Sequence, residues 1–394
     1  GCHPVNEVFE VRPAQPQEAA GSAPRGDDEP AAIADPVGYI VQMAKAHQVV
    51  FVGDRRGVAQ HLETIRSAIA PLHEAGVSSL TWEFTHSRRQ AELDRVTQSA
   101  EWDRRTAVAL FVDLMGIGHG YEEYLDVIHA VWQRNIDRPE GWPPFRLVAA
   151  GLPTFVEDPD LLDGRSAAET ELRNWWMGGH YRDISAIHMA NVITNEVIRH
   201  GERTVVYADE ARTHTNYVGF DGGAPDVTPA MLLKKWVGPG VARIVFHGAT
   251  PDDTLLDDVE QLVAASSESL DSFGIDLRRS TIGNVRVRAL GGVVDATPGP
   301  FELADLADGY LFVAPRRDWR PVELIPDLLG PATLAAAERR HRSLDPRPEP
   351  YTHDELEQLR SEGRDALVSG WPAEPSNDDQ DDPRRPSRRF GRRR

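Results

Sequence analysis

The sequence predicts an α/β protein, with a mostly parallel sheet flanked by helices and with disordered N- and C-terminal tails. Three observations lead to this fold class. Short apolar runs alternate with longer segments whose apolar residues recur at helical spacing, two of the runs frame one helical segment, and both chain ends are strongly biased in composition. With 394 residues, 40% of them hydrophobic and 27% charged, the chain can bury a sizeable core.

The first predicted strand is residues 47–54, HQVVFVGD, where a valine-rich run ends in Gly-Asp. Residues 58–76, VAQHLETIRSAIAPLHEAG, have the 3.6-residue apolar period of a helix. A second strand follows directly at 77–84, VSSLTWEF. A strand, a helix and a strand in succession form a β-α-β unit, which predicts parallel strands and a right-handed crossover.

The remaining elements continue this alternation. Helices are predicted over residues 121–135 and 181–201, and a mostly polar helix, which we expect to pack weakly, over 353–368. Residues 285–292, VRVRALGG, alternate charged or small residues with apolar ones, which predicts an edge strand. The other predicted strands are 145–151, 202–210, 241–248 and 308–315.

Composition divides the chain into four parts. These are a tether over 1–35, an α/β domain over 36–346, a C-terminal helical extension over 347–370 and a disordered Arg-rich tail over 371–394. The tether is rich in Pro, Ala, Gly and acidic residues, which bury too little apolar area to order themselves. The tail is either a solvated segment or a contact for phosphates, lipid head groups or the acidic body of the protein.

The single cysteine, Cys2, follows Gly1 and precedes the tether, an arrangement that resembles the cleavage site of a bacterial lipoprotein. We therefore expect a lipid on Cys2 and a cell-envelope protein tethered to a bacterial membrane, with a free thiol as the alternative. One cysteine excludes an internal disulfide framework and a cysteine-rich zinc site. The formal net charge of −19 argues against nucleic acid as the main partner and leaves a small-molecule ligand.

Polar residues follow several predicted strands, and open α/β sheets bind ligands beyond the carboxyl ends of their strands. Asp54 and Glu83 end the first two strands, and His214 lies in a polar loop after a later one, so these three are the candidate catalytic residues. The alternatives are a helix cap or ion pair for Asp54 and a surface carboxylate for Glu83. Candidate ligand-binding residues at the same rim are Arg56, His61, Arg182 and Glu210. The alternatives are a partly buried packing residue for His61 and a helix cap or salt bridge for Arg182.

Taken in order, these segments resemble the superfamily that joins ChaN-like haem-binding lipoproteins, EreA-like erythromycin esterases and Tiki-type metalloproteases. The resemblance spans most of residues 48–316. Its first motif is an apolar strand ending in Gly-Glu-x-His with a further histidine on the next helix. The segment VVFVGDRRGVAQH places Gly53, Asp54, Arg56 and His61 at these positions.

The later motifs are also present. LTWEF places Glu83 at the glutamate that ends the second strand, and RDISAIHMANVI followed by TVVYADEARTHTN places His214 at the loop histidine. DGYLFVAP is similar to the final strand. The resemblance implies a parallel sheet with a polar site at its rim, with haem or a divalent metal as candidate cofactors. Arg56 stands where the superfamily has histidine and adds a cation that suits an anionic ligand such as a haem propionate.

Three functions remain open. The first is a lipid-anchored envelope protein that binds a small ligand, with haem as one candidate, in a crevice at the sheet rim. The second is a metal-assisted or acid/base hydrolase of esters or amides, with Glu83 and His214 as acid/base residues and Asp54 in support. The third is a catalytically inactive scaffold that displays its tails to a protein partner.

Overall fold

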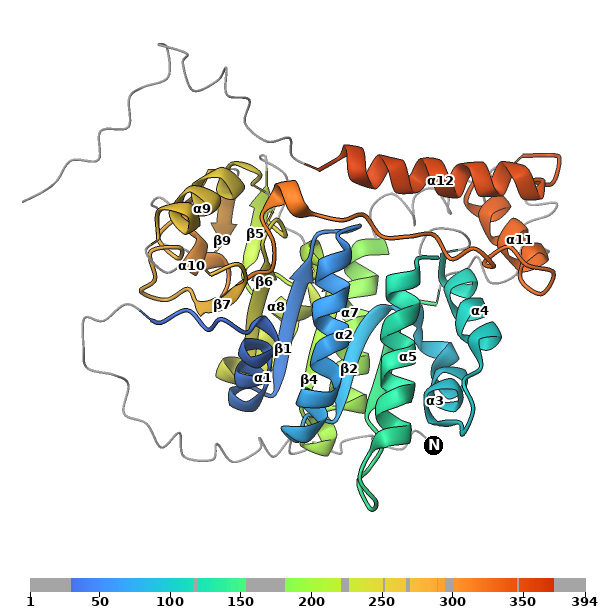
Figure 1. Cartoon of the computed structure of the whole chain (residues 1–394), viewed down its shortest axis with the longest axis horizontal. Coiled ribbons are helices and arrows are strands. Elements are labelled where there is room, and N and C mark those ends of the chain that lie inside the picture. Colours follow the sequence, from blue (N-terminus) through green and yellow to red (C-terminus); the bar gives the residue numbers. More distant parts are fainter. Residues whose placement is uncertain are drawn as a thin grey trace, which may run out of the picture.

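A computed structural model of the chain (Figure 1) describes residues 30–115, 120–153, 181–220, 227–250, 252–266, 270–288, 290–294, 301–345 and 347–371. Cys2, most of the tether and the tail from residue 372 onward lie outside these residues. Within the described part, no helix is both long and apolar enough to span a membrane.

A seven-stranded sheet forms the centre of the protein, in the order β3-β2-β4-β1-β6-β11-β7. Its strands pair in parallel except β7, which is antiparallel to β11. The predicted α/β class is therefore confirmed. β1 and β2 are parallel, but both pair with β4, which lies between them. The strands are β1 (Val49–Asp54), β2 (Ser79–His86), β3 (Arg146–Gly151), β4 (Thr204–Asp209), β6 (Val241–Phe246), β7 (Phe273–Asp276) and β11 (Gly309–Phe312).

The edge strand predicted at 285–292 is present as strand but does not form one continuous element. This segment instead supplies two short strands of separate two-stranded sheets, in which β8 (Arg286–Val287) pairs with β10 (Phe301–Glu302) and β9 (Leu290–Val294) pairs with β5 (Tyr217–Phe220). Between them, the backbone N–H of Arg288 donates to the carboxylate of Asp252 and so takes part in neither ladder.

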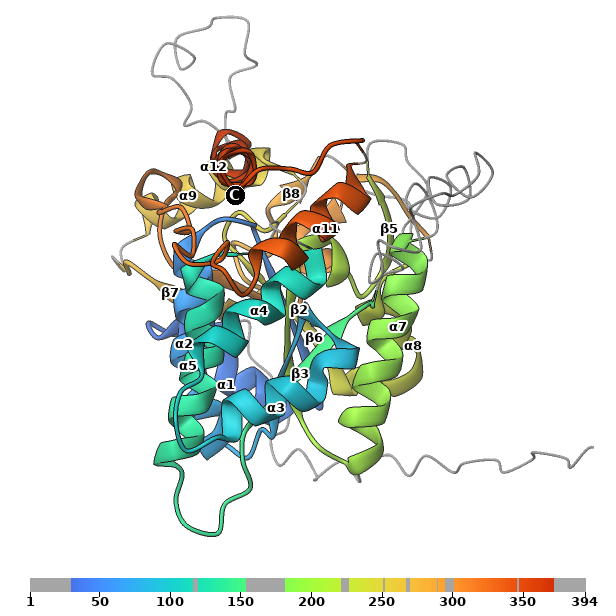
Figure 2. The same cartoon turned by 90° about the vertical axis from the view of Figure 1, so that its right-hand side faces the viewer.

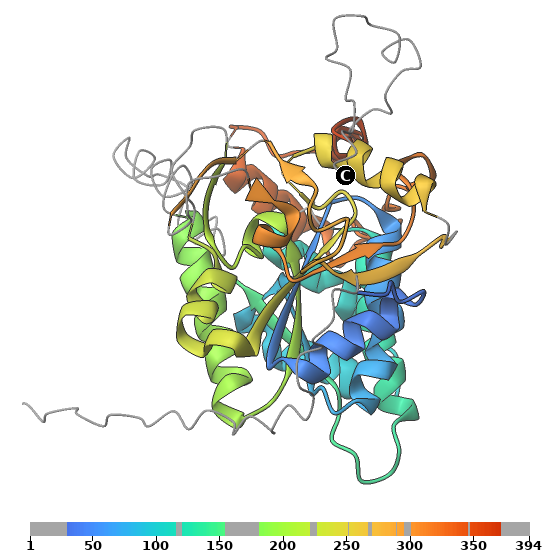
Figure 3. The same ribbon diagram turned by 90° about the vertical axis from the view of Figure 1, so that its left-hand side faces the viewer.

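Helices cover both faces of the sheet, as Figures 2 and 3 show. One face packs against α1, α2 and α5, and the other against α7 and α8, which share buried apolar contacts with the strands. The helices are α1 (Pro36–Ala46), α2 (Ala59–Glu74), α3 (Gln90–Gln98), α4 (Arg104–Met115), α5 (Glu122–Asp137), α7 (Tyr181–Glu196), α8 (Pro229–Val237), α9 (Thr254–Ala265), α10 (Leu303–Leu306), α11 (Leu334–Leu344) and α12 (His353–Ser369). Single 3-10 turns occupy Ser87–Arg89, Ile198–His200, Glu210–Arg212, Gly238–Gly240 and Arg316–Asp318.

Helix α2 shows how the sequence pattern produces this packing. Its buried side chains Leu62, Ile65, Ile69 and Leu72 recur at three- and four-residue spacing, which places them on one face of the helix. The chain then turns at Gly76, whose φ of +79° lies in the left-handed region that glycine adopts without steric cost. The helix predicted over residues 58–76 from its apolar periodicity is thus confirmed as α2.

The C-terminal helix α12 runs along one edge of the domain and is firmly attached to it (Figure 1). Leu356 is fully buried in the main core. The buried Arg360 donates from Nη2 to the backbone carbonyl of Ile325 at 2.7 Å. After the helix, the ring of Trp371 meets that of Trp319 edge to face, with centroids 5.7 Å apart. The expectation that this helix packs weakly is wrong, because the buried side chains of Leu356 and Arg360 attach it to the domain.

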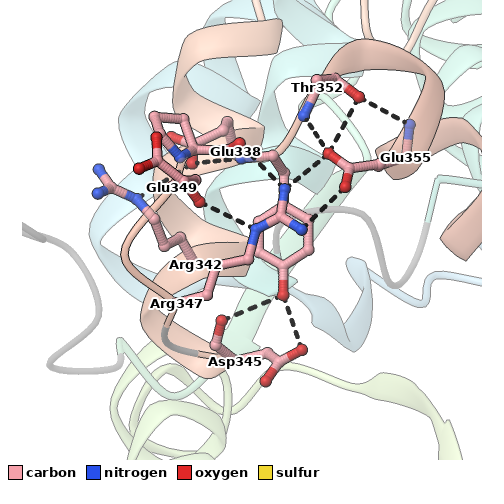
Figure 4. A network of polar contacts seen from close by, with 9 residues as sticks. Glu338, Arg342, Asp345, Arg347, Glu349, Thr352 and Glu355 are labelled. Atoms are coloured by element: carbon pink, nitrogen blue, oxygen red, sulfur yellow. Dashed lines mark hydrogen bonds and ion pairs between the residues drawn. The ribbon is translucent and has the colours of Figure 1, made fainter.

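A polar network fixes the turn that leads into α12 (Figure 4). Arg347 forms two hydrogen bonds with Glu355, at 2.9 and 2.6 Å. Its guanidinium lies 3.5 Å from the centre of the Tyr351 ring, whose hydroxyl donates to Asp345 Oδ2 at 2.7 Å. Thr352 and Glu355 cap the first turn of the helix reciprocally. These contacts set the direction in which α12 leaves the turn.

We expect Leu356→Ala to lower the free energy of unfolding by about 3 kcal/mol, because the deletion leaves a cavity in a closely packed core. Chemical denaturation measures this change. Ile187→Ala is the matched control, since Ile187 on α7 is 48% exposed and should lose less than about 1 kcal/mol. Equal losses in the two variants would show that α12 is not part of the cooperative domain.

Candidate functional site

The carboxyl ends of β1, β2 and β4 carry polar side chains that lie close together. We call this group, together with Arg243 of β6, the rim cluster. Helix α12 ends beside it, because Arg55 in the loop after β1 donates to the Gly370 carbonyl at 3.2 Å and Trp371 donates to the Arg56 carbonyl at 3.4 Å. The rim cluster consists of Asp54, Arg56, Glu83, Tyr207, Asp209, Glu210, Arg212, His214 and Arg243.

Asp54 ends β1 with its side chain inside the protein, only 2% exposed. The Tyr207 hydroxyl donates to Asp54 Oδ2 at 2.6 Å, whereas Oδ1 has no hydrogen-bond partner among the described residues. Burial, with a contribution from the carboxylate of Asp209, raises the pKa of Asp54 to about 8. Asp54 is therefore largely a neutral acid at neutral pH.

Glu83 ends the apolar part of β2 and is more accessible, with 15% of its side chain exposed. Its Oε1 accepts the backbone N–H of Asp209 at 2.7 Å, and its Oε2 lies 3.6 Å from Arg212 Nε. Burial raises the pKa of Glu83, and the Arg212 guanidinium opposes that shift. A carboxylate that is partly desolvated but still paired with a cation is a stronger base than one in water.

Asp209 and Arg56 form the outer side of the rim cluster. Arg56 Nε lies 2.5 Å from Asp209 Oδ2, while Asp209 Oδ1 accepts the backbone N–H of Ala211 and caps the short turn after β4. Half of the Arg56 side chain is exposed. The arginine that replaces the motif histidine therefore presents a cation to solvent beside two carboxylates.

Beneath this surface, His214 and Arg243 both contact Glu210. His214 Nε2 is 2.5 Å from Glu210 Oε1, and Arg243 Nη2 is 3.2 Å from the same oxygen. Arg243 also donates to the Thr213 hydroxyl at 3.1 Å and to the Leu306 carbonyl at 2.7 Å. Burial lowers the pKa of His214, and Glu210 opposes the shift. His214 thus holds Glu210 in place and does not face solvent.

Gly53 allows the loop after β4 to approach β1. A Cβ atom at this position would lie 2.6 Å from Thr213 Oγ1 and 3.3 Å from the Cα of Glu210. Any side chain would push the loop outward and, with it, Glu210 and His214. Gly53 thus permits a close approach between two segments that are distant in sequence.

His61 does not join the rim cluster, so its prediction as a ligand-binding residue is wrong. Its ring stacks on Phe246 with centroids 4.3 Å apart, and its Nδ1 accepts the Arg55 backbone N–H at 3.3 Å. The histidine shares the buried face of α2, and burial lowers its pKa to about 3. Arg182 lies in the first turn of α7, but its side chain falls outside the described part of the structure.

The structure adds four members for which no role was predicted: Tyr207, Asp209, Arg212 and Arg243. Arg243 could have been found, since it is a lone charge inside the apolar run VARIVF, and a buried charge needs partners. Tyr207 had no such signal, because tyrosine is common in strands.

Neither candidate cofactor fits the rim cluster. Haem iron needs an accessible axial ligand, yet His214 and Tyr207, the histidine and the tyrosine of the rim cluster, are both buried. Among the described residues, no three His, Cys, Asp or Glu side chains form a group suited to a metal ion.

Comparisons with known proteins concern the fold. The chain is similar in structure to an erythromycin esterase. The likeness to EreC has a TM-score of 0.49 at 12% identity, covering 70% of this chain and 92% of EreC. A succinoglycan biosynthesis protein gives 0.49 at 10% identity over 75% of this chain and 96% of its own. ChaN of Campylobacter jejuni, crystallised with cofacial haem, gives 0.29 at 10% identity over 55% of this chain and 90% of ChaN.

No family model matches the chain, and no curated protein matches it in sequence. EreC and ChaN represent two of the groups that the sequence motifs resemble. The chemistry of this chain therefore has to be argued from the rim cluster itself.

Proposed function

We propose that the protein is a hydrolase of small esters or amides that uses acid/base catalysis at the rim cluster. The observation that carries this proposal is the pair of carboxyl groups at the ends of β1 and β2, on either side of β4. Asp54 is buried and largely neutral, whereas Glu83 is partly exposed and paired with Arg212. Two carboxyl groups held in different environments titrate apart, which leaves Glu83 as the one that exchanges protons with a substrate.

Glu83 is the candidate base, because it combines partial exposure with a raised pKa. Its carboxylate takes a proton from water, and the resulting hydroxide adds to the carbonyl carbon of the substrate. The alcohol or amine then leaves with the proton from Glu83, and a carboxylic acid is released. Each step conserves protons and charge without a cofactor.

The two arginines of the outer rim supply the charge stabilisation. Arg212, 16% exposed, and Arg56, 50% exposed, lie next to Glu83 and Asp209. Negative charge develops on the carbonyl oxygen when water adds, and a fixed guanidinium nearby lowers the energy of that state. Asp54, His214 and Arg243 lie deeper and act as positioning residues, since they hold Tyr207, Glu210 and the loop after β4 in place.

The test uses a panel of chromogenic carboxylic esters and anilides with the full chain. We expect Glu83→Gln to lower kcat/KM by 100-fold or more on any substrate that is hydrolysed, because glutamine cannot accept the proton. Initial rates at several substrate concentrations measure this loss.

Glu202→Gln is the matched control. Glu202 accepts a hydrogen bond from the Ser78 hydroxyl next to the starts of β2 and β4, at the other end of the sheet, so the same chemical change should leave the rates unaltered. Hydrolysis that continues at the wild-type rate in Glu83→Gln would contradict the proposal.

A further inference from the structure

A serine and a histidine outside the rim cluster lie within hydrogen-bond distance of each other. Ser87 Oγ is 2.9 Å from Nε2 of His188, which projects from α7. Ser87 is the first residue after β2, and both side chains are half-buried. The pair is therefore fixed by the protein and still open to solvent.

The neutral His188 ring can act as a base towards Ser87. A neutral imidazole carries a hydrogen on one nitrogen and accepts a proton at the other, and with the hydrogen on Nδ1 the accepting nitrogen is Nε2, the one beside Ser87. Burial lowers the pKa of His188, which keeps the ring neutral at physiological pH. His188 can thus receive the hydroxyl proton of Ser87.

The backbone around Ser87 suits the charge that would develop there. Ser87 begins a continuous helical segment, formed by the 3-10 turn Ser87–Arg89 and then α3, and no side chain caps its start at His86. The first N–H groups of a helix have no partner within the helix, and they stabilise negative charge. β3 packs against both α3 and α7 (Figure 2). Ser87 lies in the turn just before α3 and His188 lies on α7, so packing on β3 holds the two residues together.

We propose that Ser87 is a nucleophile activated by His188, and that this pair forms a covalent intermediate with an electrophilic ester. His188 Nε2 takes the proton from Ser87 Oγ, which bonds to the carbonyl carbon. The alcohol leaves with the proton from His188 and an acyl-serine remains. Water attacks the acyl-serine with His188 again as the base, which releases the acid and restores the serine.

This site does not depend on the function proposed for the rim cluster, because the two share no residue. Glu83 lies on β2, but it contacts the backbone of β4, whereas Ser87 lies beyond the end of β2 and faces α7. A covalent probe needs no turnover, so its outcome is separate from that of the hydrolysis assay.

The experiment treats the full chain with a fluorophosphonate probe, which reacts with activated serines, and locates the adduct by mass spectrometry of intact protein and of peptides. We expect one adduct, on Ser87, that is absent in Ser87→Ala. His188→Gln is expected to slow labelling by 100-fold or more, because glutamine accepts no proton.

Ser67→Ala is the matched control, since the hydroxyl of Ser67 is exposed on α2 and donates only to the Glu63 carbonyl. Its labelling should equal that of the wild type. Circular dichroism of each variant distinguishes loss of reactivity from loss of fold. The proposal fails if no adduct forms on the folded protein, if the adduct persists in Ser87→Ala, or if folded His188→Gln is labelled at the wild-type rate.

Discussion

Replacing Arg243 with methionine is expected to lower the free energy of unfolding by about 3–5 kcal/mol. The guanidinium is 1% exposed and contacts Glu210, Thr213 and Leu306. Methionine fills a similar volume but removes the donor to the Leu306 carbonyl and the positive charge beside Glu210. A buried ion pair that loses one partner leaves an uncompensated charge. Urea denaturation at pH 7 measures the change.

Arg320→Met is the matched control for this variant. Arg320 pairs with Glu63 at 2.6 Å, but its side chain is 59% exposed, and such surface pairs contribute at most about 1 kcal/mol. The double variant Arg243→Met with Glu210→Gln is expected to recover part of the stability, because it also removes the unpaired charge. A loss at Arg243 no larger than that at Arg320 would contradict the role of the buried contacts.

The pH dependence of stability is expected to change strongly in Asp54→Asn. In the unfolded chain an aspartate ionises near pH 3.9, whereas the folded protein raises the pKa of Asp54 to about 8. Between these values the folded state keeps a proton that the unfolded state has lost. Each pH unit therefore costs the wild type about 1.4 kcal/mol of stability through this group, and the loss levels off above pH 8.

Asparagine resembles the neutral acid and has no proton to lose. The stability of Asp54→Asn minus that of the wild type should therefore increase with pH, by roughly 5 kcal/mol in total between pH 4 and 8. Urea denaturation at one-unit intervals measures it. Asp318→Asn, at a side chain that is 60% exposed, is the control and should follow the wild type. A difference for Asp54→Asn that stays constant across this range would show that Asp54 is ionised in the folded protein.

Strands that are long apolar runs could be predicted from the sequence. Short strands that form only because another strand lies beside them could not. β1, β4 and β6 were found because valine-rich runs buried on both faces look alike in any parallel sheet, and β2 was found as an apolar run directly after a helix. β7 has only four residues, FGID, and becomes a strand because β11 lies beside it. The local sequence pattern of β7 does not indicate that β11 will lie beside it.

The candidate site was predictable in position but not in protonation or contacts. Asp54 and Glu83 were found because parallel strands end at one edge, which follows from the fold class alone. That Asp54 would be buried against Tyr207 depends on β4 inserting between β1 and β2. His61 was misassigned because a helix face cannot be oriented before its packing partners are known. Ser87 and His188 are brought together only by the packing of α7 on β3.

The central place of β1 has a consequence for synthesis on the ribosome. Its two partners, β4 and β6, come much later in the chain, so β1 has no neighbour to pair with until Asp209 has been synthesised, and its second edge stays unpaired until Phe246. Contacts between distant segments form slowly, and unpaired apolar strands aggregate. The nascent chain therefore carries the buried strand β1 without a partner over the whole of α2, β2, α5 and β3, which makes β1 a segment that chaperones would bind.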